Sequence, residues 1–339
     1  MKIAILGSGG REHALANQIK KSKKTDKIYC IPGNAGTGAI GENININLDD
    51  FNGIYNFVNE RQIDLVVVGP EKPLVEGISD FLKEKKIKVF GPSKKASQFE
   101  GSKTFTKNIC KQYGIPTAKF EILKNLEQSI EYLKKVEFPI VIKADGLAAG
   151  KGVYICKDMG NASEAVKEIF NGKFGKAKNL LIEEFLDGEE MSYFVISDGK
   201  SYQFIGSAQD HKRVGEGDKG KNTGGMGCYS PSRLLSTRLD EKINNKIIIP
   251  TLNAIKDMGS EYIGFLYVGL MIKNDNPYLV EFNVRMGDPE CQTILPKLKT
   301  DLVEILQACC DKKLNEIYIE WFNKKSLCVV LCSKGYPEK

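Results

Sequence analysis

The chain has 339 residues, of which 42% are hydrophobic and 27% charged, and its formal net charge is +6. This composition is typical of soluble globular proteins, and the length predicts two or three packed units. No apolar run reaches the roughly 20 residues of a membrane helix, and the N-terminus lacks the features of a signal peptide. The scattered lysines are not interleaved with aromatic residues. We therefore expect a cytoplasmic protein that binds neither membranes nor nucleic acid.

Residues 1–92 alternate short β-branched runs with helical patterns. The expected strands are Ile3–Leu6, Lys27–Ile31, Ile63–Val68 and Ile87–Phe90, and the expected helices include Glu12–Lys20 and Leu74–Lys85. This alternation predicts parallel βαβ units. In such a sheet, ligands bind at the carboxyl ends of the strands, where this sequence places its glycine-rich turns.

The first glycine-rich turn, Gly7-Ser8-Gly9-Gly10, follows a strand and opens a helix. Glycines allow close backbone approach, and a helix N-terminus offers free N–H groups to an anion. A dinucleotide site would continue as G-x-G-x-x-G, but Glu12 occupies the third glycine position, and the second strand ends in Pro32-Gly33-Asn34 rather than near an acid. We predict a small phosphorylated ligand; a nicotinamide site and a purely structural turn are the alternatives.

The remainder of the chain predicts a second α/β unit and a third, mixed stretch. Two short helices are expected within 94–116. The following unit should contain the strands Lys119–Leu123, Pro139–Lys143, Gly152–Cys156 and Leu180–Phe185 and the helices Leu126–Lys135 and Ala162–Phe170. Residues 187–325 mix strands with long helical patterns at 236–257 and 288–311. The strand Leu327–Cys332 begins a sheet that the sequence leaves incomplete.

Four segments carry the residue types that ATP chemistry needs. Lys103 follows Gly101-Ser102, and Lys143 ends a strand ahead of a small-residue loop. Five acids surround a turn within 182–190. Glu281 and Asn283 lie two apart on a strand and so face one side of it. Cations and a flexible loop suit phosphates, and carboxylate and amide oxygens suit Mg²⁺. The Walker pattern G-x-x-x-x-G-K-[ST] is absent from the sequence.

Eight segments together resemble the phosphoribosylamine–glycine ligase family of ATP-grasp enzymes, in the family's order. They are GSGGREHALA (7–16), PGNAGT (32–37), VVGPEKPLV (67–75), FEGSK (99–103), IVIKADGLAAGKGV (140–153), IEEFLDGEE (182–190), QDHKRVGEGDKGKNTGGMGCYSP (209–231) and EFNVRMGDPE (281–290). The resemblance implies that ATP, glycine and 5-phosphoribosylamine give glycinamide ribonucleotide, ADP and phosphate in de novo purine biosynthesis. It also implies Mg²⁺ or Mn²⁺ as the metal, and a monomer or weak homodimer.

The same resemblance implies an α/β fold with an N-terminal βαβ domain followed by a two-lobed ATP-grasp domain. The expected boundaries are 1–100 for the substrate-binding domain, 101–325 for the ATP-grasp domain (lobes at about 117–186 and 187–325), and 326–339 for the start of a truncated C-terminal subdomain. That subdomain is expected because the family usually continues through a further C-terminal subdomain, and this chain ends near its beginning.

Residue roles follow from the matched motifs. For ATP they are Lys103 and Lys143 on the phosphates, Ala148, Ala149, Gly150, Lys151 and Gly152 as a phosphate lid, Glu183, Glu184, Phe185 and Leu186 as the adenine hinge, and Glu190 on the ribose. For the reaction they are Glu281 and Asn283 on the metal, Lys212 and Arg285 as catalytic residues, and Gly9, Gly10, Glu71 and Asp210 at the substrates. Glu183 and Glu184 are neighbours on a strand, so only one of them can face adenine.

The C-terminal end is one departure from the family pattern; a second departure and three rival functions remain. Many ATP-grasp enzymes place a second metal carboxylate where this sequence has Gly269. A carboxylase or formate-dependent transformylase of the same superfamily would share the ATP residues, but the segments 210–213 and 224–227 favour the glycine ligase. A non-catalytic nucleotide-binding module would not require both Glu281 and Asn283. A nicotinamide oxidoreductase is the third rival.

Overall fold

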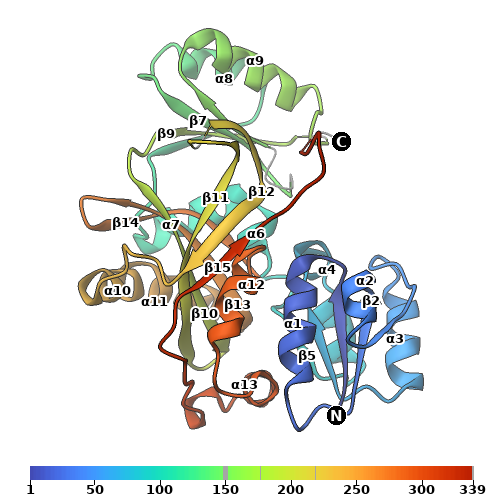
Figure 1. Cartoon of the computed structure of the whole chain (residues 1–339). Helices are drawn as coiled ribbons and strands as arrows, with labels where there is room; N and C mark the ends of the chain where they lie inside the picture. Colours follow the sequence, from blue (N-terminus) through green and yellow to red (C-terminus); the bar gives the residue numbers. More distant parts are fainter. Residues whose placement is uncertain (148–151, 176, 218, 338–339) are drawn as a thin grey trace.

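The computed structural model describes residues 1–147, 152–175, 177–217 and 219–337. These residues form an α/β structure with three sheets, arranged as an N-terminal unit beside a large lobe, with a smaller lobe at the far end of the large one (Figure 1). The α/β class, with a parallel sheet in an N-terminal βαβ unit followed by two further lobes, is the one expected from the sequence. No helix among the described residues is long and apolar enough to cross a membrane.

The N-terminal sheet is five-stranded and parallel, with the strand order β3-β2-β1-β4-β5. Its strands are β1 (Lys2–Gly7), β2 (Lys27–Pro32), β3 (Glu42–Asn43), β4 (Leu65–Val68) and β5 (Val89–Phe90). Its helices are α1 (Gly10–Lys20), α2 (Ala35–Gly38), α3 (Phe51–Glu60), α4 (Glu71–Glu76) and α5 (Ile78–Glu84). Strand β4, which lies between β1 and β5, is buried along its whole length, which explains its unbroken Leu-Val-Val-Val run.

The helix predicted over Leu74–Lys85 was wrong in its extent, because the structure divides it into α4 and α5 at Gly77. Gly77 adopts φ +103°, a left-handed conformation that side-chain-bearing residues avoid and that ends a helix. The break lets α4 begin at Glu71, directly after the carboxyl end of β4. Glu71 is thereby placed at the sheet edge where ligands were expected.

Two helices lead from this sheet into the small lobe. They are α6 (Gln98–Gly101) and α7 (Lys103–Tyr113). The small lobe is a four-stranded antiparallel sheet of order β6-β9-β7-β8 covered by two helices. Its elements are β6 (Phe120–Leu123), α8 (Leu126–Leu133), β7 (Ile140–Ala144), β8 (Val153–Cys156), α9 (Met159–Phe170) and β9 (Leu180–Glu184).

The large lobe is built on a six-stranded antiparallel sheet of order β14-β13-β10-β11-β12-β15. Its strands are β10 (Glu189–Asp198), β11 (Tyr202–Gly215), β12 (Lys219–Ser230), β13 (Ile263–Lys273), β14 (Asn276–Asn283) and β15 (Ser326–Val329). The prediction that the final strand begins a separate sheet was wrong, because β15 pairs with β12 in the register Cys228↔Cys328 and forms one edge of this sheet. The domain boundaries predicted at residues 100 and 325 stay predictions.

Both long helical patterns of the large lobe are interrupted in the structure. The first consists of α10 (Thr237–Ile243), a π-helical turn (Asn244–Ile248) and α11 (Ile249–Asp257). Pro250 donates no hydrogen bond to the preceding turn, which explains the wider turn before it. The prediction of one helix over 288–311 was wrong: α12 (Glu290–Ile294) passes into a 3₁₀ turn (Leu295–Lys297) containing Pro296, and α13 (Leu302–Cys310) starts separately.

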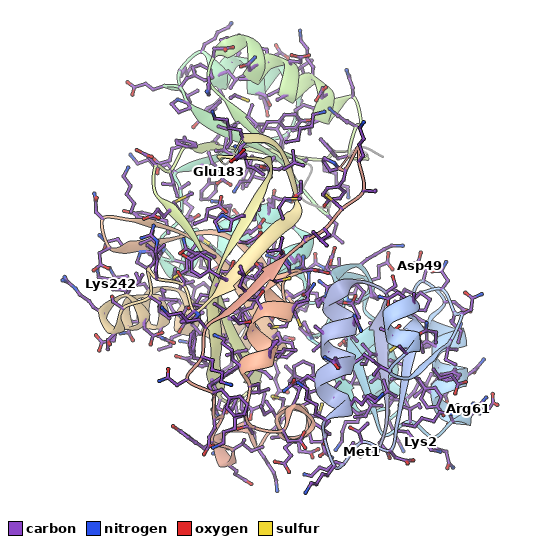
Figure 2. The ribbon with its side chains drawn as sticks, viewed as in Figure 1. Met1, Lys2, Asp49, Arg61, Glu183 and Lys242 are labelled. Atoms are coloured by element: carbon purple, nitrogen blue, oxygen red, sulfur yellow. The ribbon has the colours of Figure 1, made fainter. Side chains whose placement is uncertain are left out.

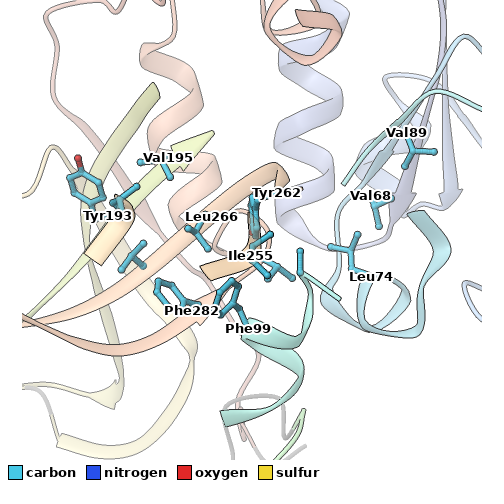
Figure 3. Packing of buried hydrophobic residues seen from close by; sticks show 14 of the residues in the cluster. Val68, Leu74, Val89, Phe99, Tyr193, Val195, Ile255, Tyr262, Leu266 and Phe282 are labelled. Atoms are coloured by element: carbon cyan, nitrogen blue, oxygen red, sulfur yellow. The ribbon is translucent and has the colours of Figure 1, made fainter. Parts of the chain in front are cut away.

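The hydrophobic core runs from the N-terminal sheet into the large lobe without a break, as Figure 3 shows for Val68, Leu74, Phe99 and Phe282. The rings of Phe99 and Phe282 lie 5.1 Å apart, centre to centre. On the other face of the parallel sheet, the rings of Phe90 and Phe265 are 5.0 Å apart. The small lobe instead has a core of its own. The candidate site lies where these two bodies meet.

Candidate nucleotide and substrate site

Two buried lysines share one buried glutamate between the small lobe and the large lobe. Glu183 on β9 is 4% exposed, and Figure 2 shows it on the small-lobe sheet above the strands of the large lobe. Its Oε2 atom lies 3.0 Å from Lys143 Nζ and 3.2 Å from Lys107 Nζ. Val141 pairs with Glu183, so Lys143, two residues further along β7, lies on the same face. The strand pattern thus places a charged cluster inside the lobe junction.

The other residues of the predicted hinge are arranged differently. Glu184 lies on the opposite face of β9, is exposed, and accepts a hydrogen bond of 2.9 Å from the Lys119 backbone N–H. Phe185 is partly exposed, whereas Leu186 is buried. Only Glu183 of the two neighbouring glutamates therefore faces the junction.

Lys103 lies at the start of α7, beside the glycine-rich loop of the small lobe. Its Nζ donates a 2.9 Å hydrogen bond to the Gly146 carbonyl, and burial lowers the pKa of its ammonium. Ser102 is the N-cap of α7, and Asp145 accepts a further hydrogen bond of 3.2 Å from the Thr104 backbone N–H in its first turn. In the predicted lid, Ala148, Ala149, Gly150 and Lys151 lie outside the described residues. The Gly152 carbonyl accepts a 2.8 Å hydrogen bond from Ala144 N–H.

A pocket in the large lobe brings together four further predicted residues. It is lined by Glu190, Met191, Ser192, Asp210, Lys212, Tyr267, Gly269, Leu270, Val280 and Glu281. Lys212 Nζ lies 3.2 Å from Glu190 Oε2. Burial would lower the pKa of Lys212, but Tyr267, Glu190, Glu281 and Asp210 together raise that pKa well above its ordinary value. Lys212 is therefore a cation in this pocket.

Asp210 is held in an unfavourable environment for a carboxylate. Burial, together with the nearby charge of Glu290, raises the pKa of Asp210 to about 8. Its Oδ1 atom is buried and has no hydrogen-bond partner among the described residues. The side chain thus offers an unused acceptor at the pocket.

Glu281 is close to charges of both groups described above, Lys143 at the lobe junction and Lys212 in the large-lobe pocket. Burial would raise the pKa of its carboxyl, but Lys212, Lys143, Lys103 and Arg285 lower that pKa. Lys143 Nζ also donates to the Val280 carbonyl at 3.3 Å, next to Glu281 on β14. An ionised carboxylate surrounded by cations, with the Asn283 amide two residues away, fits Mg²⁺ that takes its other ligands from phosphate and water.

Gly269 lies directly opposite Glu281 on the neighbouring strand β13. A Cβ atom at Gly269 would come within 3.3 Å of the Glu281 Cγ atom. The position where related enzymes were expected to carry a second metal carboxylate therefore has no side chain here.

Arg285 connects the metal strand to the N-terminal unit. Its Nε donates to Glu71 at 3.0 Å, and its Nη2 donates to Glu100 at 2.7 Å and to Asn283 Oδ1 at 3.2 Å. Nη1 donates to the Met286 carbonyl at 3.2 Å. Burial raises the pKa of Glu100 to about 7 even though the Arg285 charge opposes that shift. Arg285, predicted from the sequence as a catalytic residue, and Glu71, predicted to contact a substrate, are thus a bonded pair.

Two domain models of one protein family match most of the chain. Residues 1–100 match the model of the phosphoribosylglycinamide synthetase N domain, and residues 101–291 match that of the phosphoribosylglycinamide synthetase ATP-grasp (A) domain. The chain belongs to the phosphoribosylamine–glycine ligase family.

Individual relatives agree with this assignment. The chain is 46% identical to the phosphoribosylamine–glycine ligase of Brucella melitensis biotype 1 over 338 residues, which cover 99% of this chain and 79% of that protein. The crystal structure of phosphoribosylamine–glycine ligase from Thermotoga maritima matches with a TM-score of 0.87 at 34% identity, over 100% of this chain and 82% of that one. The biotin carboxylase domain of Hydrogenobacter thermophilus 2-oxoglutarate carboxylase, solved with MgADP, ADP and bicarbonate, shares the fold (TM-score 0.71, 20% identity, 96% and 73% covered).

Within this family member, the first glycine loop contacts carboxylates of the protein itself. Gly9 N–H donates to Glu12 Oε2 at 2.7 Å, and Arg11 N–H donates to Asp288 Oδ2 at 3.1 Å. A Cβ atom at Gly10 would lie 3.4 Å from Asp288 Oδ1. A phosphate at this helix N-terminus would therefore share its surroundings with the Asp288 carboxylate.

Two buried residues of the site were not predicted. Lys107 is one helical turn after Lys103 and reads as an ordinary helix position, while Glu100 was noticed only as part of the FEGSK match. Their partners are distant in sequence: Glu183 for Lys107 and Arg285 for Glu100. One sign in the sequence could have indicated the role of Lys107. It is a charged residue at a position of an amphipathic helix where the apolar pattern predicts a core residue.

Proposed function

We propose that the chain ligates glycine to 5-phosphoribosylamine at the expense of ATP, giving glycinamide ribonucleotide, ADP and phosphate with Mg²⁺ or Mn²⁺. The observation that carries this proposal is Glu281, an ionised carboxylate next to Asn283 and surrounded by Lys103, Lys143, Lys212 and Arg285. This arrangement suits a metal-bound triphosphate, and membership of the ligase family supplies the reaction.

A carboxylate does not react with an amine in water at useful rates, because oxide is a poor leaving group. Transfer of the γ-phosphoryl group of ATP to the glycine carboxylate releases ADP and forms an acyl phosphate, whose phosphate can leave. The amine of phosphoribosylamine then attacks the acyl carbon. The protein needs to neutralise charge, align the reactants and exclude water, and it needs no covalent nucleophile.

The charged side chains divide this work among them. Lys103 and Lys143 would hold ATP phosphates from the small-lobe side, and Lys212 from the large-lobe pocket. Glu281 and Asn283 would hold the metal, which supplies charge neutralisation at the phosphates when bound. Glu183 would face adenine, and Glu190 the ribose. Asp210, Glu71, Gly9, Gly10 and Arg285 would serve the two remaining substrates and the acyl phosphate.

Isotope transfer tests the reaction directly. Glycine labelled with ¹⁸O in its carboxylate should pass one label per turnover into inorganic phosphate, while ADP stays unlabelled. Phosphate release should require both glycine and phosphoribosylamine, which distinguishes this ligase from carboxylases and transformylases of the same fold. Unlabelled phosphate from an active enzyme would exclude the acyl-phosphate route.

A further inference from the structure

Lys107 is a buried lysine for which the proposed reaction has no direct use. It lies on α7, and its side chain is 4% exposed. Burying an ammonium group is costly unless it is paired and hydrogen-bonded. Lys107 pairs with Glu183 Oε2 at 3.2 Å and donates to Thr117 Oγ1 at 2.6 Å. Its ammonium also lies 5.4 Å from the centre of the Phe120 ring. These protein contacts place Lys107 behind the nucleotide site rather than in it.

The two lysines and Glu183 together carry an excess of one positive charge. Lys143 and Lys107 both approach the same oxygen, Oε2, and Glu183 Oε1 is buried with no hydrogen-bond partner among the described residues. Without Lys107, Lys143 and Glu183 would form a neutral pair. With it, the Glu183 charge is already compensated, and the Lys143 charge remains available to an anion.

Lys107 also fixes this cluster to the strand of the proposed metal ligands. Thr117, which accepts from Lys107, donates in turn to the Leu279 carbonyl at 2.6 Å. Lys143 reaches the adjacent Val280 carbonyl. Both lysines are therefore anchored to β14 immediately before Glu281, and they hold Glu183 of the small lobe at a fixed place relative to that strand.

We propose that Lys107 is a positioning residue of the nucleotide site, which shares the Glu183 carboxylate so that Lys143 keeps its positive charge for a nucleotide phosphate. This inference rests on the nucleotide site of the proposed function. It predicts a defect confined to phosphate recognition, because Lys107 compensates charge and does not touch the base or sugar.

The test measures the binding of ATP and of adenosine by calorimetry. Lys107→Met removes the charge at similar length, and should weaken ATP binding by at least ~10-fold while changing adenosine binding by less than ~3-fold. Lys111→Met, which alters an exposed lysine one turn further along α7, should change neither. Equal losses for ATP and adenosine would show a merely structural role, and unchanged ATP binding would also overturn the proposal.

A second variant covers the case in which Lys107→Met fails to fold. Lys107→Met combined with Glu183→Gln leaves no uncompensated buried carboxylate and restores the single positive charge, on Lys143. Because Glu183 is also the residue proposed to face adenine, the affinity for ATP is compared with the affinity for adenosine in the same variant. The ratio of these two affinities should lie within ~3-fold of the ratio in the unaltered chain. A ratio of ATP affinity to adenosine affinity more than ~10-fold below that of the unaltered chain would overturn the proposal, because charge compensation could not then explain the role of Lys107.

The two proposals fail in different ways. If the unaltered chain binds ATP but transfers no ¹⁸O to phosphate, the ligase reaction is wrong and the Lys107 measurements still decide its role. If the label is transferred while Lys107→Met binds ATP normally, only the role of Lys107 is wrong.

Discussion

Glu281 is the residue on which most of the site's charge converges. Glu281→Gln keeps the shape of the side chain and removes its charge, and we expect turnover to fall by at least ~10²-fold, since metal charge stabilisation contributes several kcal/mol. The matched control is Glu184→Gln, which alters an exposed carboxylate outside the junction. Steady-state phosphate release measures both, and near-normal turnover of Glu281→Gln would remove the metal assignment.

Glu190 separates nucleotide recognition from glycine recognition. Its carboxylate is half exposed and pairs with Lys212, so a bound ribose can reach it. Glu190→Ala should raise the KM for ATP and largely spare the KM for glycine. The two KM values are compared in the same assay, and an unchanged KM for ATP would leave Glu190 only the role of a partner to Lys212.

Asp210 gives the folded chain a specific pH dependence. The pKa of its carboxyl is raised to about 8 by burial and Glu290, so between about pH 4 and 8 the folded state holds a proton that the unfolded state releases. Its contribution to stability is therefore lost as the pH rises through that window. Asp210→Asn should become progressively more stable than the unaltered chain from pH 4 to 8. Melting curves at several pH values check this, and a constant difference would contradict it.

At the residue scale, the sequence predicted the direction of a side chain wherever a local rule of strand or helix geometry determines it. Strand alternation separates Glu183 from Glu184, and puts Glu281 and Asn283 on one face. Local rules could not reveal that Lys107 is paired with Glu183, or that Arg285 is bonded to Glu71 and Glu100. Those contacts join segments about 75 to 215 residues apart in the sequence.

At the scale of elements, short apolar strands were predicted well and helix continuity was not. A strand of four to six buried residues such as β4 is recognisable from its own letters. Gly77 and Pro296 interrupt helices whose hydrophobic spacing continues past them. A prediction from periodicity alone therefore treats α4 and α5 as one helix, and α12 and α13 as another. The extent of each helix depended on backbone conformation at a single position.

Gly225 in β12 is a position where the element tolerates no side chain. It adopts φ +130°, and a Cβ atom there would lie 2.5 Å from Pro289 Cδ and 2.8 Å from Asp210 Oδ1. Gly225→Ala should lower the free energy of unfolding by roughly 2–4 kcal/mol, from strain and overpacking together. Gly259→Ala, also at positive φ but with nothing within 4 Å, should cost only about 1 kcal/mol. Urea denaturation compares them, and equal losses would contradict the steric argument.

At the scale of the whole molecule, the shared core predicts which parts of the chain unfold together. The N-terminal sheet and the large lobe are joined through Phe99 and Phe282, and the small lobe packs on its own core. Phe282→Ala should speed hydrogen exchange in both β4 and β13, whereas Ile182→Ala should speed it in the small-lobe strands alone. Exchange measured by mass spectrometry tests this, and uniform acceleration by Ile182→Ala would show one cooperative unit.

The guanidinium of Arg285 has little spare capacity. Four of its five N–H groups donate to Glu71, Glu100, Asn283 and the Met286 carbonyl among the described residues. An anion that takes a single hydrogen bond can be added to this set, but one that takes two must displace a partner. When that partner is Glu71, binding of the anion to Arg285 breaks a contact that joins the large lobe to the N-terminal unit. Anion binding and docking of the N-terminal unit then weaken each other by the same factor.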